Sequence, residues 1–144
     1  CAGTGKRPVY VPRPRGCAVT ALKWPVTPLV MNWGGRFLWQ RYGRPIYITE
    51  NGQSCNDRIF LDGCVHDPDR IDFLHRYLLA LRAAEGGADV RGYFHWALTD
   101  NFEWSEGYRE RFGLVYIDYV TGARIPKDSA AWYAETVRAN GENL

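Results

Sequence analysis

The chain has 144 residues, a length that suits one ordinary domain. Hydrophobic residues make up 46% of it and charged residues 24%, a composition typical of a chain that folds. The net charge of only +2 argues against a nucleic-acid partner, although the basic stretch "KRPVYVPRPRG" keeps that as a second interpretation. No apolar run approaches the roughly 20 residues that a membrane span needs, so we expect no membrane partner.

Four cysteines are present, and their spacing matches neither a CxxC motif nor a zinc site. We therefore expect no metal and no other cofactor. Cys55 and Cys64 are close enough in sequence to close a small loop, but free thiols in a cytoplasmic protein are the simpler interpretation. No signal peptide is recognisable, and because the chain begins with Cys1 rather than Met, a preceding targeting segment stays an open question.

The N-terminal quarter of the sequence predicts an irregular arm followed by a helix. Residues 1–26 are rich in Pro and Gly, with one short strand expected near Val19–Leu22. Thr27 is suited to cap the next helix and Pro28 to occupy its first turn. Apolar residues then follow at helical spacing, and Gly43 is expected to end this helix.

A strand and a long helix come next. Pro45–Thr49 is short and almost fully apolar, which is typical of a strand buried on both faces of a parallel sheet. After a polar loop, Asp67 is expected to cap a helix that Pro68 begins and Gly86-Gly87 stops. The apolar residues at helical spacing along it are Ile71, Leu74, Tyr77, Leu78 and Leu81.

The rest of the chain alternates in the same way. "VRGYFHWAL" predicts a second strand ending near residues 98–100, and "GLVYIDY" predicts a further short strand. Asp128 is expected to cap a last helix that Gly141 ends. Strand, helix, strand, helix is the order of a parallel sheet with right-handed crossovers, so the fold class is α/β. A (β/α)8 barrel needs about 250 residues, so the chain is either something smaller or part of a barrel.

Glu50 stands where the first parallel strand ends, in "YITENG". A carboxylate at this place is held by a rigid element and opens into a cleft, which suits a nucleophile or a general acid. The alternative is a solvated glutamate at a strand-to-loop turn.

The segment "HWALTDNFEWSEGYRERFG", residues 95–113, interleaves aromatic rings with carboxylates. Rings cover the C–H faces of a pyranose, and carboxylates accept hydrogen bonds from its hydroxyls. The alternative is that the rings belong to the core and the acids are solvated. The cluster as a whole favours a small-molecule sugar site.

"YITENG" together with "GYFHWALTDNFEWSEGYRERFGLVYIDY" resembles the C-terminal part of glycoside hydrolase family 1, the β-glucosidase family. "WPVTP" and "RIPKDSAAWYAE" match the same family in the same order, from about Pro12 to Asn140. The resemblance implies that residues 27–144 form the C-terminal part of a (β/α)8 TIM barrel, strands 7 and 8 with their helices, after the arm of residues 1–26. It also implies retaining hydrolysis of a β-glycoside substrate by double displacement.

The resemblance assigns a role to each matching side chain. Glu50 matches the catalytic nucleophile. Glu103 and Trp104 match residues that contact the hydroxyls of the sugar at the non-reducing end. Trp96 matches the ring that stacks beneath this sugar, and Phe112 resembles an aromatic wall of the pocket.

Two positions depart from the family pattern. Trp24 resembles a tryptophan at the leaving-group side, but Lys23 stands beside it where the family usually has Gly. His95 stands where an aliphatic residue is common, and we expect it to be a packed strand residue rather than a catalytic base.

The sequence lacks part of what the chemistry needs. A retaining glycosidase uses two carboxyls about 5–5.5 Å apart. The family's acid/base lies in an Asn-Glu-Pro motif, which this chain does not contain. Asp100 is the nearest substitute by sequence, although the family does not use it so.

An isolated pair of barrel strands has two open edges, which invite association. We expect a remaining barrel segment, or self-association into a homo-oligomer, to supply the missing strands. The inward side chains expected to lose their partners are Ile46, Ile48, Tyr93 and Leu98. The alternative function is a truncated, non-catalytic relative that binds sugar or self-associates.

Overall fold

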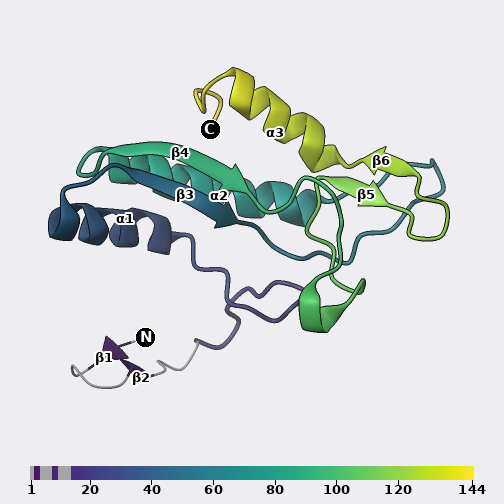
Figure 1. Cartoon of the computed structure of the whole chain (residues 1–144), viewed down its shortest axis with the longest axis horizontal. Coiled ribbons are helices and arrows are strands. Elements are labelled where there is room, and N and C mark those ends of the chain that lie inside the picture. The colour runs from purple at the N-terminus through teal and green to yellow at the C-terminus, as the bar shows by residue number, and fades with distance from the viewer. Residues whose placement is uncertain (1, 4–7, 10–13) are drawn as a thin grey trace.

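The computed structural model describes residues 2–3, 8–9 and 14–144 (Figure 1). Its helices are α1 (Leu29–Tyr42), α2 (Pro68–Glu85) and α3 (Asp128–Arg138), with one 3-10 turn, η1 (Trp104–Glu106). Its strands are β1 (Ala2–Gly3), β2 (Pro8–Val9), β3 (Ile46–Asn51), β4 (Val90–His95), β5 (Val115–Ile117) and β6 (Arg124–Pro126).

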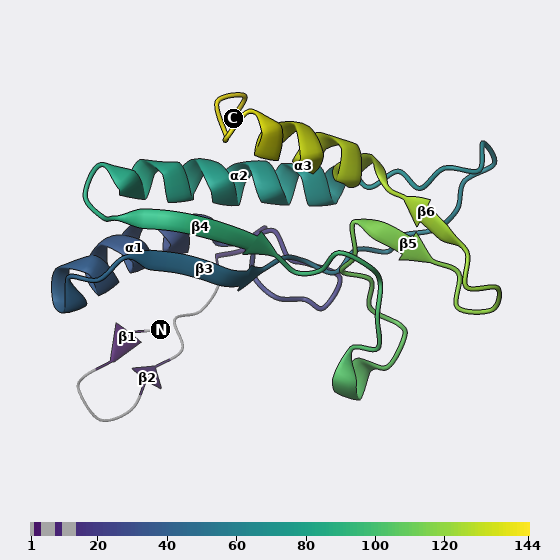
Figure 2. The ribbon, with the colours of Figure 1, turned by 45° about the horizontal axis from the view of Figure 1, so that its top comes forward.

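The centre of the fold is the parallel pair of β3 and β4, joined by the crossover helix α2. Ile46 pairs with Val90 and Ile48 with Tyr93. The expected parallel strands and crossover are therefore present. Figure 2 shows η1 and the hairpin of β5 and β6 beyond the carboxyl ends of β3 and β4, which is the end of the sheet where "YITENG" places its glutamate.

The core lies between the sheet and its helices. Its buried members are Met31, Phe73, Leu74, Tyr77, Ala80, Leu81 and Leu114. Ile48 and Tyr93 pack against this cluster, so both face the helices. The expectation that these two side chains lose their partners is therefore wrong. Side chains alternate along a strand, but the sequence does not say which set the helices cover.

The opposite face of the sheet is open. Tyr47 is 53% exposed and Phe94 is 59% exposed, and Leu98 just beyond β4 is also exposed. The expectation of a strand buried on both faces is thus wrong for this chain, because only the helix side has a covering layer. For Leu98 the expected loss of partners is confirmed.

Glycine signals at helix ends predicted the structure well. Gly43 ends α1 with a left-handed φ of 57°, and its N–H donates to the Trp39 carbonyl over 2.8 Å. Gly86 is the C-terminal cap of α2, as expected. The last helix ends earlier than expected, at Arg138 rather than next to Gly141.

Of the three predicted N-terminal caps, Asp67 is confirmed, whereas Thr27 and Asp128 are wrong. None of the three helices has a side-chain hydrogen bond at its N-terminal cap. The cap of α1 is Pro28 rather than Thr27, and Asp128 is the first residue of α3 rather than its cap. Asp67 is the cap of α2, but its carboxylate accepts hydrogen bonds from the Arg70 and Ser129 side chains instead. The Asp67 carboxylate is thus used in contacts with other side chains, which the local sequence does not show.

Short strands were the least predictable elements. Val19–Leu22 contributes only one bridge, between Val19 and Pro25. β4 ends at His95, before residues 98–100, and β5 pairs with the unpredicted β6. Much of the N-terminal arm lies outside the described residues, although β1 and β2 pair antiparallel within it.

Cys17, Cys55 and Cys64 are free thiols, as expected, and Cys1 lies outside the described residues. Within the part of the chain that the structure describes, no helix combines the length and apolarity that crossing a bilayer requires.

A buried ionic network ties the loops at the carboxyl end of the sheet to the helices. Arg70, whose side chain is fully buried, contacts Asp57 over 2.7 Å and also Asp67. The ammonium of Lys127, equally buried, contacts Asp57 and lies 2.8 Å from Asp100. These pairs connect the loop after β3, the start of α2, the loop after β4 and the start of α3.

We expect Arg70→Met to lower the free energy of unfolding by about 3–5 kcal/mol, because it removes the Arg70 charge from two buried carboxylates, Asp57 and Asp67. Urea denaturation measures this change. Arg76→Met is the matched control on the same helix, since Arg76 forms an exposed pair with Asp72 that should contribute less than about 1 kcal/mol. Equal losses for the two variants would contradict the role of the buried network.

Candidate active site

A cavity of about 210 Å³ lies at the carboxyl ends of β3 and β4. Its lining residues are Thr20, Trp24, Pro25, Glu50, Asn51, Gly52, Phe73, Tyr77, Trp96, Glu103 and Phe112. Five of the six side chains singled out from the sequence line this one cavity, and only Trp104 does not. Their proposed roles stay predictions, but the chain brings them together from four separate segments.

Glu50 is the next-to-last residue of β3, and its side chain is exposed. The turn that follows is pinned from the neighbouring strand. The hydroxyl of Tyr93 donates to Asn51 Oδ1 over 2.9 Å, and the Trp96 N–H donates to the Asn51 carbonyl, also over 2.9 Å. The backbone that carries Glu50 is therefore fixed, while its carboxylate stays open to the cavity.

Gly52 allows the two strand ends to approach each other. A Cβ at this position would lie 1.8 Å from the Trp96 carbonyl oxygen, a backbone atom that has no freedom to move aside. The peptide bond between Trp96 and Ala97 is cis. Glycine at position 52 is thus required by its close packing against the Trp96 backbone.

Glu103 and Phe112 reach the cavity from the loop after β4. The backbone N–H of Glu103 donates to the Gly107 carbonyl over 2.6 Å, which closes the turn that contains η1. Its Oε2 atom is buried and has no hydrogen-bond partner among the described residues. Phe112 is buried, and its carbonyl accepts from the Ala97 N–H over 3.1 Å. The backbone that carries Glu103 is therefore fixed, and its carboxylate has a buried acceptor atom to spare.

Trp24 lies on a tight turn whose backbone explains a departure from the family pattern. The Lys23 N–H donates to the Thr20 carbonyl and the Thr20 N–H to the Trp24 carbonyl, each over 2.8 Å. Between them Lys23 has a φ of 61°, in the left-handed region that favours glycine. The glycine that the resemblance expects at this position thus has a clear physical reason.

Trp104 stands apart from the other predicted residues. Its side chain is 79% exposed and does not line the cavity. It begins η1 with a φ of 44°, which directs the chain around the turn between Glu103 and Gly107.

Asp100 is not available as a substitute acid. Its carboxylate accepts from Arg111 over 2.6 Å, from Lys127 over 2.8 Å and from the Gly113 N–H over 2.9 Å. It belongs to the buried ionic network and does not line the cavity.

His95 is a packed strand residue, as expected. Its Nε2 atom lies 3.3 Å from the Phe112 carbonyl, and its ring contacts Tyr133 with 5.9 Å between centroids. Burial lowers the pKa of His95 to about 4, and the charge of Arg70 acts in the same direction. A histidine that stays neutral and enclosed in this way supports the fold rather than proton transfer.

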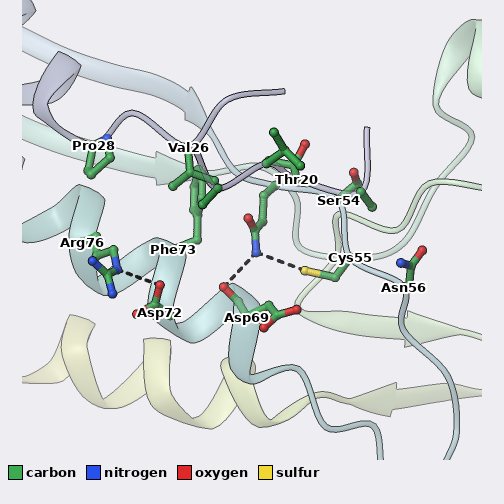
Figure 3. A pocket seen from close by; sticks show the side chains of 14 residues that line it. Thr20, Val26, Pro28, Ser54, Cys55, Asn56, Asp69, Asp72, Phe73 and Arg76 are labelled. Carbon is green, nitrogen blue, oxygen red and sulfur yellow. Dashed lines mark hydrogen bonds and ion pairs between the residues drawn. The ribbon is translucent and has the colours of Figure 1, made fainter. Parts of the chain in front are cut away.

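A larger, open cavity of about 600 Å³ lies beside the first turns of α2 (Figure 3). Thr20 and Phe73 line both cavities. Gln53 donates to the Asp69 carbonyl over 2.8 Å and to the Cys55 sulfur over 3.3 Å. Burial raises the pKa of the Cys55 thiol to about 11, so the cysteine here is not a nucleophile at neutral pH.

The family model for glycosyl hydrolase family 1 matches residues 10–142. The chain belongs to this family. It is 46% identical over 124 residues to β-glucosidase A of Thermotoga maritima, covering 85% of this chain and 28% of that protein. It is 55% identical over 96 residues to a bifunctional β-D-glucosidase/β-D-fucosidase of Bifidobacterium breve, covering 63% of this chain and 21% of that protein.

Solved structures of the family agree. A family 1 β-glucosidase from Thermotoga maritima superposes with a TM-score of 0.85 at 43% identity, over 90% of this chain and 30% of that one. The same relative is known in complex with deoxynojirimycin and with castanospermine. The family fold is a TIM barrel, and this chain is a small α/β part that spans less than a third of the length of these relatives.

Sequence reasoning missed several residues that line the cavity. Asn51 and Gly52 were not among the predicted site residues, and Tyr77 was expected only as one of the apolar residues along the helix that begins at Pro68. The contact of Gly52 with Trp96 depends on strand pairing across more than 40 positions, which no local pattern reveals. The only hint in the sequence was the position of Asn51 and Gly52 directly after Glu50.

We expect the low pKa of His95 to make the free energy of unfolding of the chain fall in acid. The folded pKa of about 4 lies below the ordinary value of 6.5, so the unfolded chain binds more protons between these values. The contribution of His95 to the free energy of unfolding is complete above pH 6.5 and is lost as the pH falls through 4. His95→Leu should flatten this decline by roughly 2–3 kcal/mol in urea denaturation across that range. Parallel pH profiles for the two proteins would contradict the assignment.

We expect Gly52→Ala to lower the melting temperature and to change the fluorescence of the tryptophans around the cavity, because the new methyl group must displace the Trp96 backbone. Gly34→Ala is the matched control. Its Cβ would meet only the Val30 side chain at 3.9 Å within α1, so a gain of about 0.5–1 kcal/mol is expected. A Gly52→Ala protein as stable as the parent would rule out the close approach.

Proposed function

We propose that this chain is the portion of a retaining β-glycosidase that carries the catalytic nucleophile, Glu50. In this proposal β3 is the seventh and β4 the eighth strand of the barrel, residues 27–144 form that barrel portion, and residues 1–26 are an arm. The observation that supports it best is the single cavity in which Glu50, Glu103, Trp96 and Phe112 meet at the carboxyl ends of parallel strands. That end of a barrel is where TIM-barrel enzymes have their active sites.

Each side chain has a chemical task in this proposal. The carboxylate of Glu50 attacks the anomeric carbon, and the glycosidic oxygen leaves with a proton from a second carboxyl. Water then cleaves the glycosyl ester at Glu50. Asp100 is fixed in the ionic network, so in this proposal the second carboxyl is that of the family's Asn-Glu-Pro motif.

The sugar is held by the remaining predicted residues. The ring of Trp96 stacks beneath the pyranose, and Phe112 forms a wall beside it. The unpartnered Oε2 of Glu103 accepts hydrogen bonds from sugar hydroxyls, and Trp104 contacts the same hydroxyls from the rim. Trp24 lies on the leaving-group side. The substrate class is a β-glucoside, in line with the names of the relatives, and the free thiols favour a cytoplasmic setting.

An activated 2-deoxy-2-fluoro β-glucoside tests the nucleophile directly, because a good leaving group reduces the need for the missing acid. We expect the intact chain to gain the mass of one fluoroglucosyl group, and peptide mass spectrometry to place it on Glu50. Glu50→Gln should abolish the labelling, whereas Glu85→Gln, a change at an exposed glutamate on α2, should leave it unchanged.

Labelling elsewhere than Glu50, or equal labelling of Glu50→Gln, would sink the proposal. A chain that binds glucose analogues in the cavity without any covalent product fits the alternative, a non-catalytic sugar-binding relative. That alternative is supported by one observation, the absence of an Asn-Glu-Pro motif from the sequence.

A further inference from the structure

The turn that carries Glu103 and Trp104 projects away from the strands in both views of the fold (Figures 1 and 2). Its own hydrogen bonds run from the Glu103 N–H to the Gly107 carbonyl over 2.6 Å and from the Gly107 N–H to the Trp104 carbonyl over 3.1 Å. Trp104 has a φ of 44°, in the left-handed region that non-glycine residues rarely adopt. Bonds within the turn close it but do not orient it relative to the sheet, so its direction depends on contacts with other segments.

Two aromatic side chains stand at the two ends of this turn. Phe102 precedes Glu103 and Tyr108 follows Gly107, and the two ring centroids lie 5.4 Å apart with 69° between the planes. Edge-to-face contacts of this kind are favourable for aromatic rings. Phe102 is 53% and Tyr108 is 58% exposed, so the pair joins the ends of the turn while burying little of either ring.

A third ring connects this pair to the hairpin of β5 and β6. Tyr119 lies in the turn between these strands, and its ring centroid is 4.6 Å from that of Tyr108. Its hydroxyl donates to the Asn101 carbonyl over 3.2 Å. Burial raises the pKa of Tyr119, and the charge of Asp100 acts in the same direction, so the hydroxyl keeps its proton as a donor. Tyr119 therefore contacts the chain on both sides of the turn.

Arg111 links Tyr119 to the buried ionic network. Its guanidinium carbon lies 4.7 Å from the ring centroid of Tyr119 and 3.9 Å from that of Tyr116, within the range of attraction between a cation and a ring. The same guanidinium donates to the Asp100 carboxylate over 2.6 Å and to the Ile117 carbonyl over 3.0 Å. A continuous set of contacts thus runs from the buried Asp100 to the exposed turn. We call its three rings the ring stack: Phe102, Tyr108 and Tyr119.

We propose that Tyr108 and Tyr119 are positioning residues for the sugar site: the ring stack holds the turn of residues 103–107 in the orientation from which Glu103 and Trp104 contact the sugar hydroxyls. Neither tyrosine lines the cavity, so both act through the turn rather than by touching the sugar. The part of this inference that concerns the sugar rests on the proposed function, whereas the part that concerns the turn does not.

Loss of the ring stack is expected to weaken sugar binding more than the chemical step. Glu50 is carried by β3, and the turn after it is aligned by hydrogen bonds from Tyr93 and Trp96, none of which involves the ring stack. An interaction made equally with the bound sugar and with the transition state changes the half-saturating concentration and leaves the limiting rate unaltered. A role in general stability would instead lower the melting temperature and the limiting rate together.

The kinetics of labelling by the activated 2-deoxy-2-fluoro β-glucoside test this split. Tyr108→Leu and Tyr119→Leu should each raise the half-saturating concentration about tenfold and change the limiting rate less than about threefold. Tyr108→Phe keeps the ring and should stay within about twofold of the parent in both quantities. Tyr42→Leu is the matched control, since Tyr42 is 62% exposed at the end of α1 and has no contact with the turn.

Nuclear magnetic resonance tests the orientation of the turn without any activity. In both leucine variants the amide signals of residues 103–107 and the indole signal of Trp104 should shift and exchange their protons faster, while the amide signals of Asn51 and Gly52 stay in place. Tyr108→Phe should leave all of these signals where the parent has them. If circular dichroism shows a leucine variant to be unfolded, Phe102→Leu gives the same comparison, because Phe102 is the exposed ring at the far end of the stack.

Three results would overturn the inference. They are unchanged signals of residues 103–107 in folded leucine variants, a Tyr108→Phe protein as impaired as Tyr108→Leu, and a limiting rate that falls as much as the half-saturating concentration rises. A parent chain that takes up no label would count against the proposed function instead, and the resonance signals would then decide whether the ring stack holds the turn.

Discussion

The buried ionic network around Arg70 and Lys127 is the interaction on which the other parts of this structure depend. Two buried cations lie among the carboxylates of Asp57, Asp67 and Asp100, and Arg111 adds a third positive charge beside Asp100. Burying charges costs several kcal/mol each, and close pairing with additional hydrogen bonds roughly offsets that cost. The network therefore fixes where these loops and helix ends lie, and it adds little net stability.

The shape of the cavity depends on where these loops are held. The network fixes the loop after β3 to the start of α2, and the loop after β4 to the start of α3. Glu50 lies before the Asp57 anchor, and Glu103 lies between Asp100 and Arg111, which pair with each other. With the backbone held, the Tyr93 hydroxyl and the Trp96 N–H align the turn after Glu50 within hydrogen-bond distance. In the proposed function, a backbone fixed in this way positions the two carboxylates for displacement at a sugar carbon.

The sequence was informative where local chemistry decides structure. Glycine at the ends of α1 and α2, the apolar run of β3 and the order of strands and helices all follow from local preferences. Prediction from the sequence failed where residues from other segments bind the side chain in question. The carboxylates expected to cap α2 and α3 bind partners elsewhere, Asp67 with Arg70 and Ser129, and Asp128 with His66. The cavity was predicted through family motifs, and the approach of Gly52 to Trp96 arises only when the strands pair.

The members of the ionic network pair with one another inside the described chain, and none of them comes from α1. The exposed apolar side chains on α1, Val30, Trp33, Phe37 and Leu38, stand outside the network. Counterions screen charges that water reaches and leave apolar contacts intact. The buried pairs and this apolar surface therefore both respond weakly to concentrated salt, whereas the exposed pair of Arg76 and Asp72 is the kind of contact that salt weakens.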